Sequence, residues 1–206
     1  LNRIFNSKSD VVSKAEFESM VQPISNSAER MTLIVEQLNS LSQATANFET
    51  KEVYISDVIE RVLKTHHLSV ELNKKMIELD YSKPESLHTV KVDIQKMEQV
   101  ILNLIRNAIE SLEKLGRMDR KISIKVREDL TGRVAFVNIE DNGEGIDAEM
   151  VDKVYDPFIT TRELNRGRGL GLTVSLSIMR EHGGDLTFQS WKGKGSCFSI
   201  RLPMES

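Results

Sequence analysis

The first extended apolar pattern in the chain lies in residues 24–48. Apolar side chains recur there at steps of four and three residues, at Ile24, Ala28, Met31, Val35 and Leu38. This spacing places them on one face of a helix. No other apolar segment is nearby to cover that face, which favours a partner helix in a two-helix hairpin that dimerises. A helix that packs on its own domain is the alternative.

Beyond Thr50 the pattern changes to a mixture of strands and helices. Strand-like segments lie at residues 53–55, 75–81, 87–92, 122–126, 134–140, 186–190 and 197–202. Helical segments lie at residues 57–72, 93–115 and 170–181. Asp93 is placed to cap the second of these helices, Gly116 to end it, and Gly183-Gly184 to close the third. The mixture predicts an α+β fold: a two-layer α/β sandwich, with a mixed, mostly antiparallel sheet faced by helices, preceded by a helical dimerisation segment.

The composition limits the classes of function. The chain is 39% hydrophobic and 29% charged with a net charge of −3, as in ordinary soluble domains, and it lacks the basic excess of nucleic-acid binders. No window approaches the roughly 18 apolar residues of a membrane span, and no signal peptide is present. The single cysteine, Cys197, excludes an internal disulfide framework. It is expected as a buried strand residue in a reducing, cytoplasmic setting.

Two asparagines interrupt the apolar face of the long predicted helix. Asn103 and Asn107 are four residues apart, so both amides lie on one side of the helix, one turn apart. Buried amides need polar partners. A side-chain amide oxygen is also a suitable ligand for Mg²⁺, which retains several waters and shares phosphate oxygens. Taken alone, the pair is better explained as capped or solvated than as a metal site.

Three further segments carry candidate chemistry. Asp141-Asn-Gly-Glu-Gly145 follows a strand, so its carboxylate could accept a hydrogen bond from an amine such as that of adenine, although the same residues could form a simple turn. Asp156-Pro-Phe-Ile-Thr-Thr-Arg162 could cover a phosphate chain, or be an ordinary loop pinned by Phe158. Gly167-Arg-Gly-Leu-Gly171 opens a helix, whose N-terminus is an anion site, but this pattern alone is common. A Walker-type phosphate loop and a dinucleotide fingerprint are both missing.

In this order and at these intervals, the four segments resemble the N, G1, F and G2 boxes of the sensor histidine kinases. These kinases belong to the superfamily of DNA gyrase and the heat-shock-protein-90 chaperones. The resemblance covers residues 53–203, and Arg106-Asn-Ala-Ile-Glu110 and Pro157-Phe-Ile-Thr-Thr-Arg are closest to the nitrogen-regulation and oxygen-sensing subclass. Residues 28–38 resemble the second dimerisation helix of these kinases.

The resemblance implies a set of ATP-binding residues. Asn107 would be the Mg²⁺ ligand, with Asn103 and Arg106 near the phosphates. Asp141 would hold the adenine amino group, in a pocket that includes Gly143, Gly145 and Ile146. An ATP lid would contain Phe158, Thr160, Thr161, Arg162, Gly167, Arg168, Gly169, Leu170 and Gly171. Arg168 departs from the family, which usually has a small hydroxylated residue there.

The resemblance also implies a function. The expected protein is the ATP-binding core of a two-component sensor histidine kinase, which transfers the γ-phosphate of ATP to a histidine for relay to a response-regulator aspartate. Residues 1–50 would be a partial dimerisation hairpin and residues 51–206 the catalytic domain. ATP and Mg²⁺ are the expected cofactors; a receiver domain and a second copy, bound through the hairpin, are the expected partners. These residues are expected to be cytoplasmic and to contact neither nucleic acid nor membrane. The parent protein could still be anchored in a membrane.

Position 103 separates this function from a rival one. ATP-hydrolysing branches carry a glutamate there as the base that activates water, whereas Asn103 takes up no proton at neutral pH. Phosphoryl transfer is therefore favoured over a GHKL-type ATPase. A regulatory binding module without transfer is a second rival, and the intact Asn107 and Asp141 argue against it.

None of the four histidines fits the acceptor of such a kinase. An acidic residue and a nearby proline follow neither His66, His67, His88 nor His182. His66 and His67 are expected to have a structural role at the surface. His88 is expected in a strand, and His182 at the end of a helix. Because the chain starts at Leu1, we expect a fragment whose acceptor lies upstream, able to bind Mg-ATP but not to phosphorylate itself.

Overall fold

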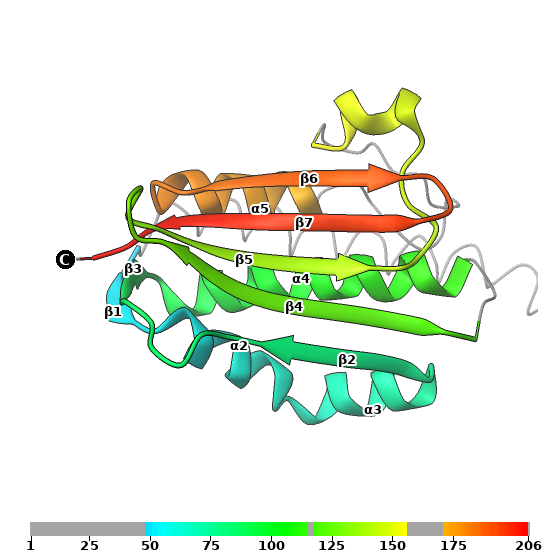
Figure 1. Cartoon of the computed structure of the whole chain (residues 1–206), viewed down its shortest axis with the longest axis horizontal. Coiled ribbons are helices and arrows are strands. Elements are labelled where there is room, and N and C mark those ends of the chain that lie inside the picture. Colours follow the sequence, from blue (N-terminus) through cyan, green and yellow to red (C-terminus); the bar gives the residue numbers. More distant parts are fainter. Residues whose placement is uncertain (1–47, 115–117, 156–170, 206) are drawn as a thin grey trace, which may run out of the picture. The chain divides into compact units, whose positions relative to one another are not determined.

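The alternating segments of the sequence form a five-stranded sheet with the order β2-β4-β5-β7-β6 (Figure 1). Its strands are β2 (Ile77–Ser82), β4 (Arg120–Asp129), β5 (Val134–Asp141), β6 (Asp185–Trp191) and β7 (Gly195–Pro203). Strand β2 is parallel to β4, and all other neighbours in the sheet are antiparallel.

The structure is a computed structural model that describes residues 48–114, 118–155 and 171–205. All of these belong to one compact unit, residues 44–206. The predicted helix at 24–48 lies outside the described residues except for Phe48. The dimerisation hairpin and the division at residue 50 therefore stay predictions.

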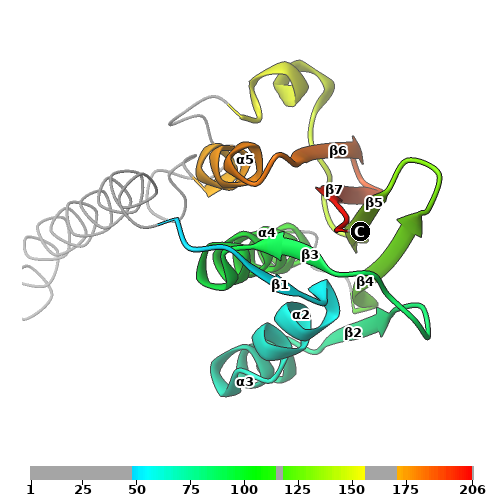
Figure 2. The same ribbon diagram turned by 90° about the vertical axis from the view of Figure 1, so that its left-hand side faces the viewer.

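A layer of helices covers one face of the sheet (Figure 2). It contains α2 (Ile55–Leu63), α3 (His66–Lys74), α4 (Ile94–Lys114) and α5 (Gly171–Glu181). A second, two-stranded sheet pairs β1 (Lys51–Val53) with β3 (Val90–Val92), and a short 3₁₀ helix, η1, spans Ala148–Lys153. The predicted two-layer α+β sandwich is confirmed.

Helix α4 provides much of the core. Its fully buried side chains recur at steps of three and four and face the sheet; they are Met97, Val100, Ile101, Leu104, Ile105, Ala108, Ile109 and Leu112. On the sheet, Ile124 and Ile139 are register partners and are buried beneath this layer. Burial of one Leu or Ile side chain stabilises a fold by roughly 1.5–3 kcal/mol, so this face fixes α4 on the sheet. Asp93 caps the helix as predicted: its Oδ1 accepts a hydrogen bond from Lys96 N at 3.1 Å.

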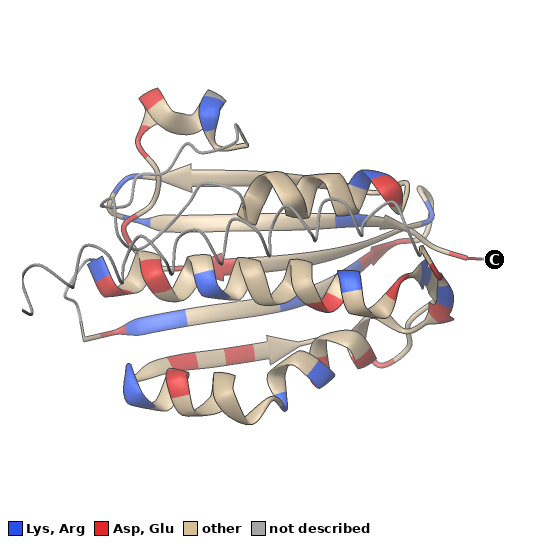
Figure 3. Cartoon of the chain, turned by 180° about the vertical axis from the view of Figure 1, so that it is seen from behind, with Lys and Arg blue, Asp and Glu red and all other residues tan. Residues whose placement is uncertain are grey.

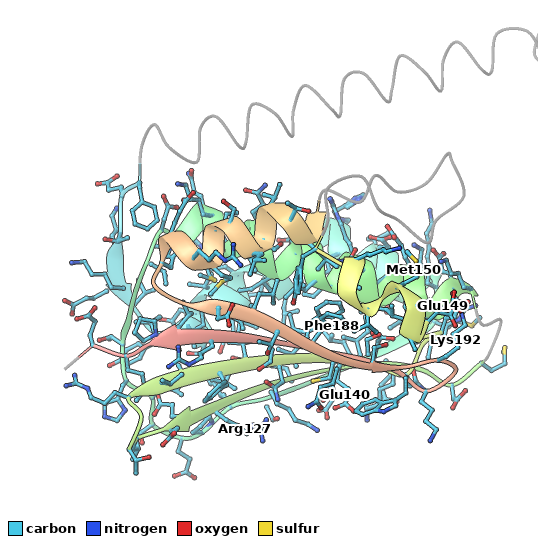
Figure 4. All side chains as sticks on the ribbon, turned by 90° about the horizontal axis from the view of Figure 1, so that it is seen from above. Arg127, Glu140, Glu149, Met150, Phe188 and Lys192 are labelled. Atoms are coloured by element: carbon cyan, nitrogen blue, oxygen red, sulfur yellow. The ribbon has the colours of Figure 1, made fainter. Side chains whose placement is uncertain are left out.

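The two faces of the sheet differ in character. Phe188 lies on the side of the helices, whereas Glu140 and Arg127 lie on the opposite side (Figure 4). Along the described helices, acidic and basic residues are interspersed (Figure 3). Among the described helices, none combines the length and the apolar character that a membrane span needs.

The structure corrects the single helix predicted at residues 57–72. Two helices, α2 and α3, meet at Thr65, which is extended (φ −66°, ψ 120°). Val62 and Leu68, both buried, are six residues apart, a step that one straight helix would not place on the same face. The hydroxyl of Thr65 donates to the carbonyl of Arg61, one of the acceptors that the end of α2 leaves free.

Three smaller expectations also need correction. The first strand covers Lys51–Val53 rather than 53–55, because Ile55 already begins α2. His88 precedes β3 instead of lying within a strand, and its backbone N and ring Nδ1 both contact Glu128. Cys197 is in a strand, β7, but is only half-buried, because it belongs to the sheet face that the helices do not cover.

Candidate functional site

The first part of the site is a contact between α4 and α5. Asn103 Nδ2 donates a hydrogen bond of 2.9 Å to Ser175 Oγ in α5. At the start of α5, a Cβ added to Gly171 would lie 2.3 Å from Asn103 Oδ1. The glycine at this position therefore lets the N-terminus of α5 pack directly against the asparagine.

Asn107 follows one helical turn after Asn103 and is half-buried, whereas Arg106 is exposed. The neighbouring positions, Leu104 and Ala108, are buried in the core. The predicted placement of two amides on one side of the helix is thus consistent with the burial pattern of α4. Asn103 thus lies at the margin of the apolar core, where α4 meets α5.

Asp141 ends strand β5 and is almost completely buried, with 5% of its surface exposed. Its Oδ1 accepts hydrogen bonds from Gly143 N at 2.8 Å and from Ser111 Oγ at 3.0 Å. Burial raises the pKa of the Asp141 carboxyl to about 6, although these hydrogen bonds act in the opposite direction. Among the described residues it has no ion-pair partner. A buried carboxylate without a cation is costly and is typical of functional sites.

The two glycines of the same segment allow close approach of the backbone. A Cβ on Gly143 would lie 2.2 Å from Ser111 Oγ, and one on Gly145 would lie 2.1 Å from Trp191 O. Gly145 also has φ +70°, which side chains other than glycine rarely adopt. The loop after β5 can therefore pass between α4 and the β6–β7 hairpin only with glycine at these positions.

Hydrogen bonds fix the loop that follows. Ile146 N donates to Ser190 Oγ at 2.8 Å. Lys192 Nζ lies 2.9 Å from both Glu144 Oε1 and Asp147 Oδ2, and the pKa of Glu144 is lowered chiefly by its hydrogen bond with Lys192. The loop is thus held to the β6–β7 hairpin on one side and to α4 on the other.

The order and spacing of these motifs match a known family. The family described as "Histidine kinase-, DNA gyrase B-, and HSP90-like ATPase" matches residues 92–206, more than half of the chain. The chain belongs to this ATPase family. The matched residues run from β3 to the end of the chain and contain Asn103, Asn107 and Asp141.

Relatives of the chain within this ATPase family are sensor histidine kinases. Over 189 residues, 92% of this chain, it is 31% identical to the sensor histidine kinase ZraS of Salmonella typhimurium strain LT2. It spans 38% of the length of that relative. The catalytic domain of the histidine kinase ThkA is 26% identical, with a TM-score of 0.64; the match covers 76% of this chain and 98% of that domain. ThkA solved in complex with the response regulator TrrA gives a TM-score of 0.72 at 24% identity, with coverage of 96% and 54%.

Part of the predicted ATP-binding set falls outside the described residues. This part comprises Phe158, Thr160, Thr161, Arg162, Gly167, Arg168, Gly169 and Leu170. The residues that flank it are joined: Thr173 Oγ1 donates to Tyr155 O at 2.8 Å, and the Tyr155 hydroxyl donates to Leu186 O at 2.7 Å. Tyr155 also meets the ring of Phe188 edge to face, at 5.7 Å between centroids. The described residues on either side of this part of the chain are therefore held together by α5 and β6.

The sequence prediction did not include Ser111 and Ser175, which this ATPase fold brings into contact with Asp141 and Asn103. A signal for Ser111 was available. It follows Asn103 and Asn107 at a further step of four, so the three polar residues lie along one line of α4. Ser175 carries no comparable signal, because α5 has several polar residues.

Proposed function

We propose that residues 51–206 bind ATP at the site between α4, α5 and the loop after β5. The observation that carries this proposal is Asp141, a buried carboxylate at the end of a central strand that has no cation partner among the described residues. A carboxylate in an apolar setting is matched by a ligand that brings its own hydrogen-bond donor. The exocyclic amine of adenine is such a donor.

The other site residues take roles that follow from their positions. Gly145 and Ile146 would line the base. Asn103, Arg106 and Asn107 would face the phosphates from α4. Phe158 to Arg162 and Gly167 to Gly171 would form the lid; of these, Gly171 opens α5, whose free backbone N–H groups suit an anion.

The donors on α4 also fit a Mg²⁺ ion that arrives with the nucleotide. Among the described residues, no group of three or more His, Cys, Asp or Glu could hold a metal. Asn107 is therefore the proposed protein ligand, through its side-chain oxygen, and phosphate oxygens and water would complete the shell. The bound ion would neutralise charge on the phosphates, while Asn107 and the lid would orient them.

We infer that the reaction is transfer of the γ-phosphate to a histidine, followed by relay to an aspartate of a response regulator. Asn103 supports transfer rather than hydrolysis, because its amide is hydrogen-bonded to Ser175 and is no base. His182 does not suit an acceptor: its Nε2 accepts from Asp93 N at 2.9 Å and its Nδ1 contacts Ile178 O at 2.7 Å. Both ring nitrogens are thus occupied in a buried side chain.

The proposed acceptor is a histidine outside these 206 residues. The proposed partners are a receiver domain and a second copy of the chain, joined through a helical hairpin in residues 1–50. A cytoplasmic location fits both partners. The kinship with sensor histidine kinases supports this assignment, and the nitrogen-regulation and oxygen-sensing subclass stays a prediction.

Calorimetric titration with a non-hydrolysable ATP analogue, with and without Mg²⁺, tests the proposal. We expect binding that Mg²⁺ strengthens and that Asp141→Asn abolishes, because an amide nitrogen would then meet the adenine amine. Asp80→Asn, at an exposed position of β2, is the matched control and should bind like the parent. Absence of binding by the unmodified chain would refute the proposal and favour a regulatory module without transfer.

A further inference from the structure

Ser111 is the point at which α4 meets the loop after β5. Its hydroxyl donates to Asp141 Oδ1 at 3.0 Å, and its carbonyl accepts from Glu144 N at 3.1 Å. Gly143 packs so closely that a Cβ there would lie 2.2 Å from Ser111 Oγ. One helical position therefore contacts the last residue of β5 and two residues of the loop after it, through its side chain and its backbone.

These contacts determine how the Asp141 carboxylate is oriented. Oδ1 has two donors, Ser111 Oγ and Gly143 N, on the same oxygen. Ser196 is the β7 register partner of Asp141, and its backbone lowers the pKa of the carboxyl. Rotation of the carboxylate would break these bonds. A carboxylate oxygen has two lone pairs, so Oδ2 retains acceptor capacity for a ligand.

Because of its electrostatic surroundings, the ionised form of Asp141 depends strongly on the hydrogen bond from Ser111. The groups that meet Asp141 from the neighbouring elements are uncharged: Ser111 in α4, Ile122 in β4 and Ser196 in β7. Among the described residues, the nearby charge of Glu140 raises the pKa of Asp141. The charged form of Asp141 therefore depends on hydrogen-bond donors rather than on cations, and Ser111 is the side-chain donor among them.

We propose that Ser111 is a positioning residue for base recognition, which holds the Asp141 carboxylate in the orientation and charge state that select adenine over guanine. This inference rests on the proposed nucleotide-binding function. Adenine presents an amine, which donates to a carboxylate. Guanine presents a carbonyl at the same ring position, and two acceptors facing each other in a buried site repel. Without the hydroxyl, the carboxylate is freer to rotate and more easily protonated, and both changes weaken this selection.

The test is a set of titrations with non-hydrolysable ATP and GTP analogues between pH 5 and pH 8. Ser111→Ala should lower affinity for the ATP analogue about 3- to 10-fold at pH 8, the effect of one lost hydrogen bond. The loss should grow towards lower pH, with the midpoint of the binding curve higher by about one pH unit. Preference for the ATP analogue over the GTP analogue should fall. Ser111→Cys keeps the size of the side chain with a weaker donor and should give intermediate values.

Ser175→Ala is the matched control, because it removes the serine hydroxyl that accepts from Asn103. It should lower affinity without moving the pH midpoint or the base preference, since it does not touch Asp141. A second readout needs no ligand: NMR titration of the Asp141 carboxyl should give a higher midpoint in Ser111→Ala than in the parent.

The outcomes are distinguishable. If the parent binds the ATP analogue and Ser111→Ala has the same affinity, pH midpoint and base preference, the role of Ser111 is wrong while the proposed function survives. If affinity falls but the midpoint and preference are unchanged, as in Ser175→Ala, Ser111 only supports the fold and the inference fails. If the parent binds neither analogue, the proposed function fails and this inference fails with it.

Discussion

Replacement of Asp141 by asparagine should stabilise the ligand-free protein while it abolishes nucleotide binding. The carboxyl is buried, and burial raises its pKa from 3.8 to about 6. An acid whose pKa is higher in the folded state destabilises that state whenever it is ionised. The cost appears as pH rises through 3.8, grows until about pH 6 and is constant above it. Stability of the parent is therefore expected to fall with rising pH across this window.

The magnitude follows from the same pKa values. A rise from 3.8 to about 6 corresponds to about 3 kcal/mol at neutral pH. Asparagine keeps an oxygen for the donors Gly143 N and Ser111 Oγ, but its amide nitrogen replaces the second acceptor, at a cost of about 1 kcal/mol. The net gain is about 2 kcal/mol. For a domain of this size, that gain raises Tm by roughly 4–8 °C.

Thermal and urea unfolding, followed by circular dichroism at pH 7.5 and at pH 4, provide the assay. The variant should be more stable at pH 7.5, and its advantage should nearly vanish at pH 4, where the parent carboxyl is protonated in the folded state. The control, Asp80→Asn, removes an exposed carboxylate and should change stability by less than about 0.5 kcal/mol. A variant that is equally or less stable at pH 7.5 would show that burial of the charge is not costly, and the reasoning about Asp141 would be wrong.

Three further predictions concern other parts of the site and the chain. Gly145→Ala should reduce binding of an ATP analogue more than 10-fold, since its Cβ would lie 2.1 Å from Trp191 O; Gly193→Ala, with a similar φ but nothing within 4 Å, should bind normally and lose about 1 kcal/mol. In calorimetry, Asn107→Ala should bind the analogue equally with and without Mg²⁺, and a retained Mg²⁺ effect would exclude it as the ligand. Leu38→Glu should yield a monomer in light scattering if residues 24–48 mediate dimerisation; an unchanged mass would refute that role.

The sequence predicted those parts of the protein that depend on short-range patterns. The burial of α4 follows directly from its apolar period, and the cap at Asp93 is a local signal. The placement of Asn103 and Asn107 on one side of α4 depends only on the helical period. The position of Asp141 at a strand end is also local, because β5 stops at this residue.

The contacts that complete the site join distant parts of the chain and could not be predicted in this way. Ser111 and Asp141 are 30 residues apart, and Asn103 and Ser175 are 72 apart. Their meeting depends on the strand order and on the crossing of α4 and α5 over the sheet, which periodicity does not encode. The break at Thr65 was missed for a different, local reason: each half of the segment has a helical pattern, and only the six-residue step between buried positions reveals two helices.

Helix α4 links the core and the site through one geometric constraint. Its buried face is fixed on the sheet by residues such as Ile105 and Ile109, so the rotation of the helix about its axis is fixed as well. The line of Asn103, Asn107 and Ser111 then has a defined direction: its first residue contacts α5 and its last contacts the end of β5. A change that rotates α4 would therefore misplace both contacts together, even without touching a polar residue. Substitutions that keep apolar volume at Ile105 or Ile109 should preserve the site, because they preserve that rotation.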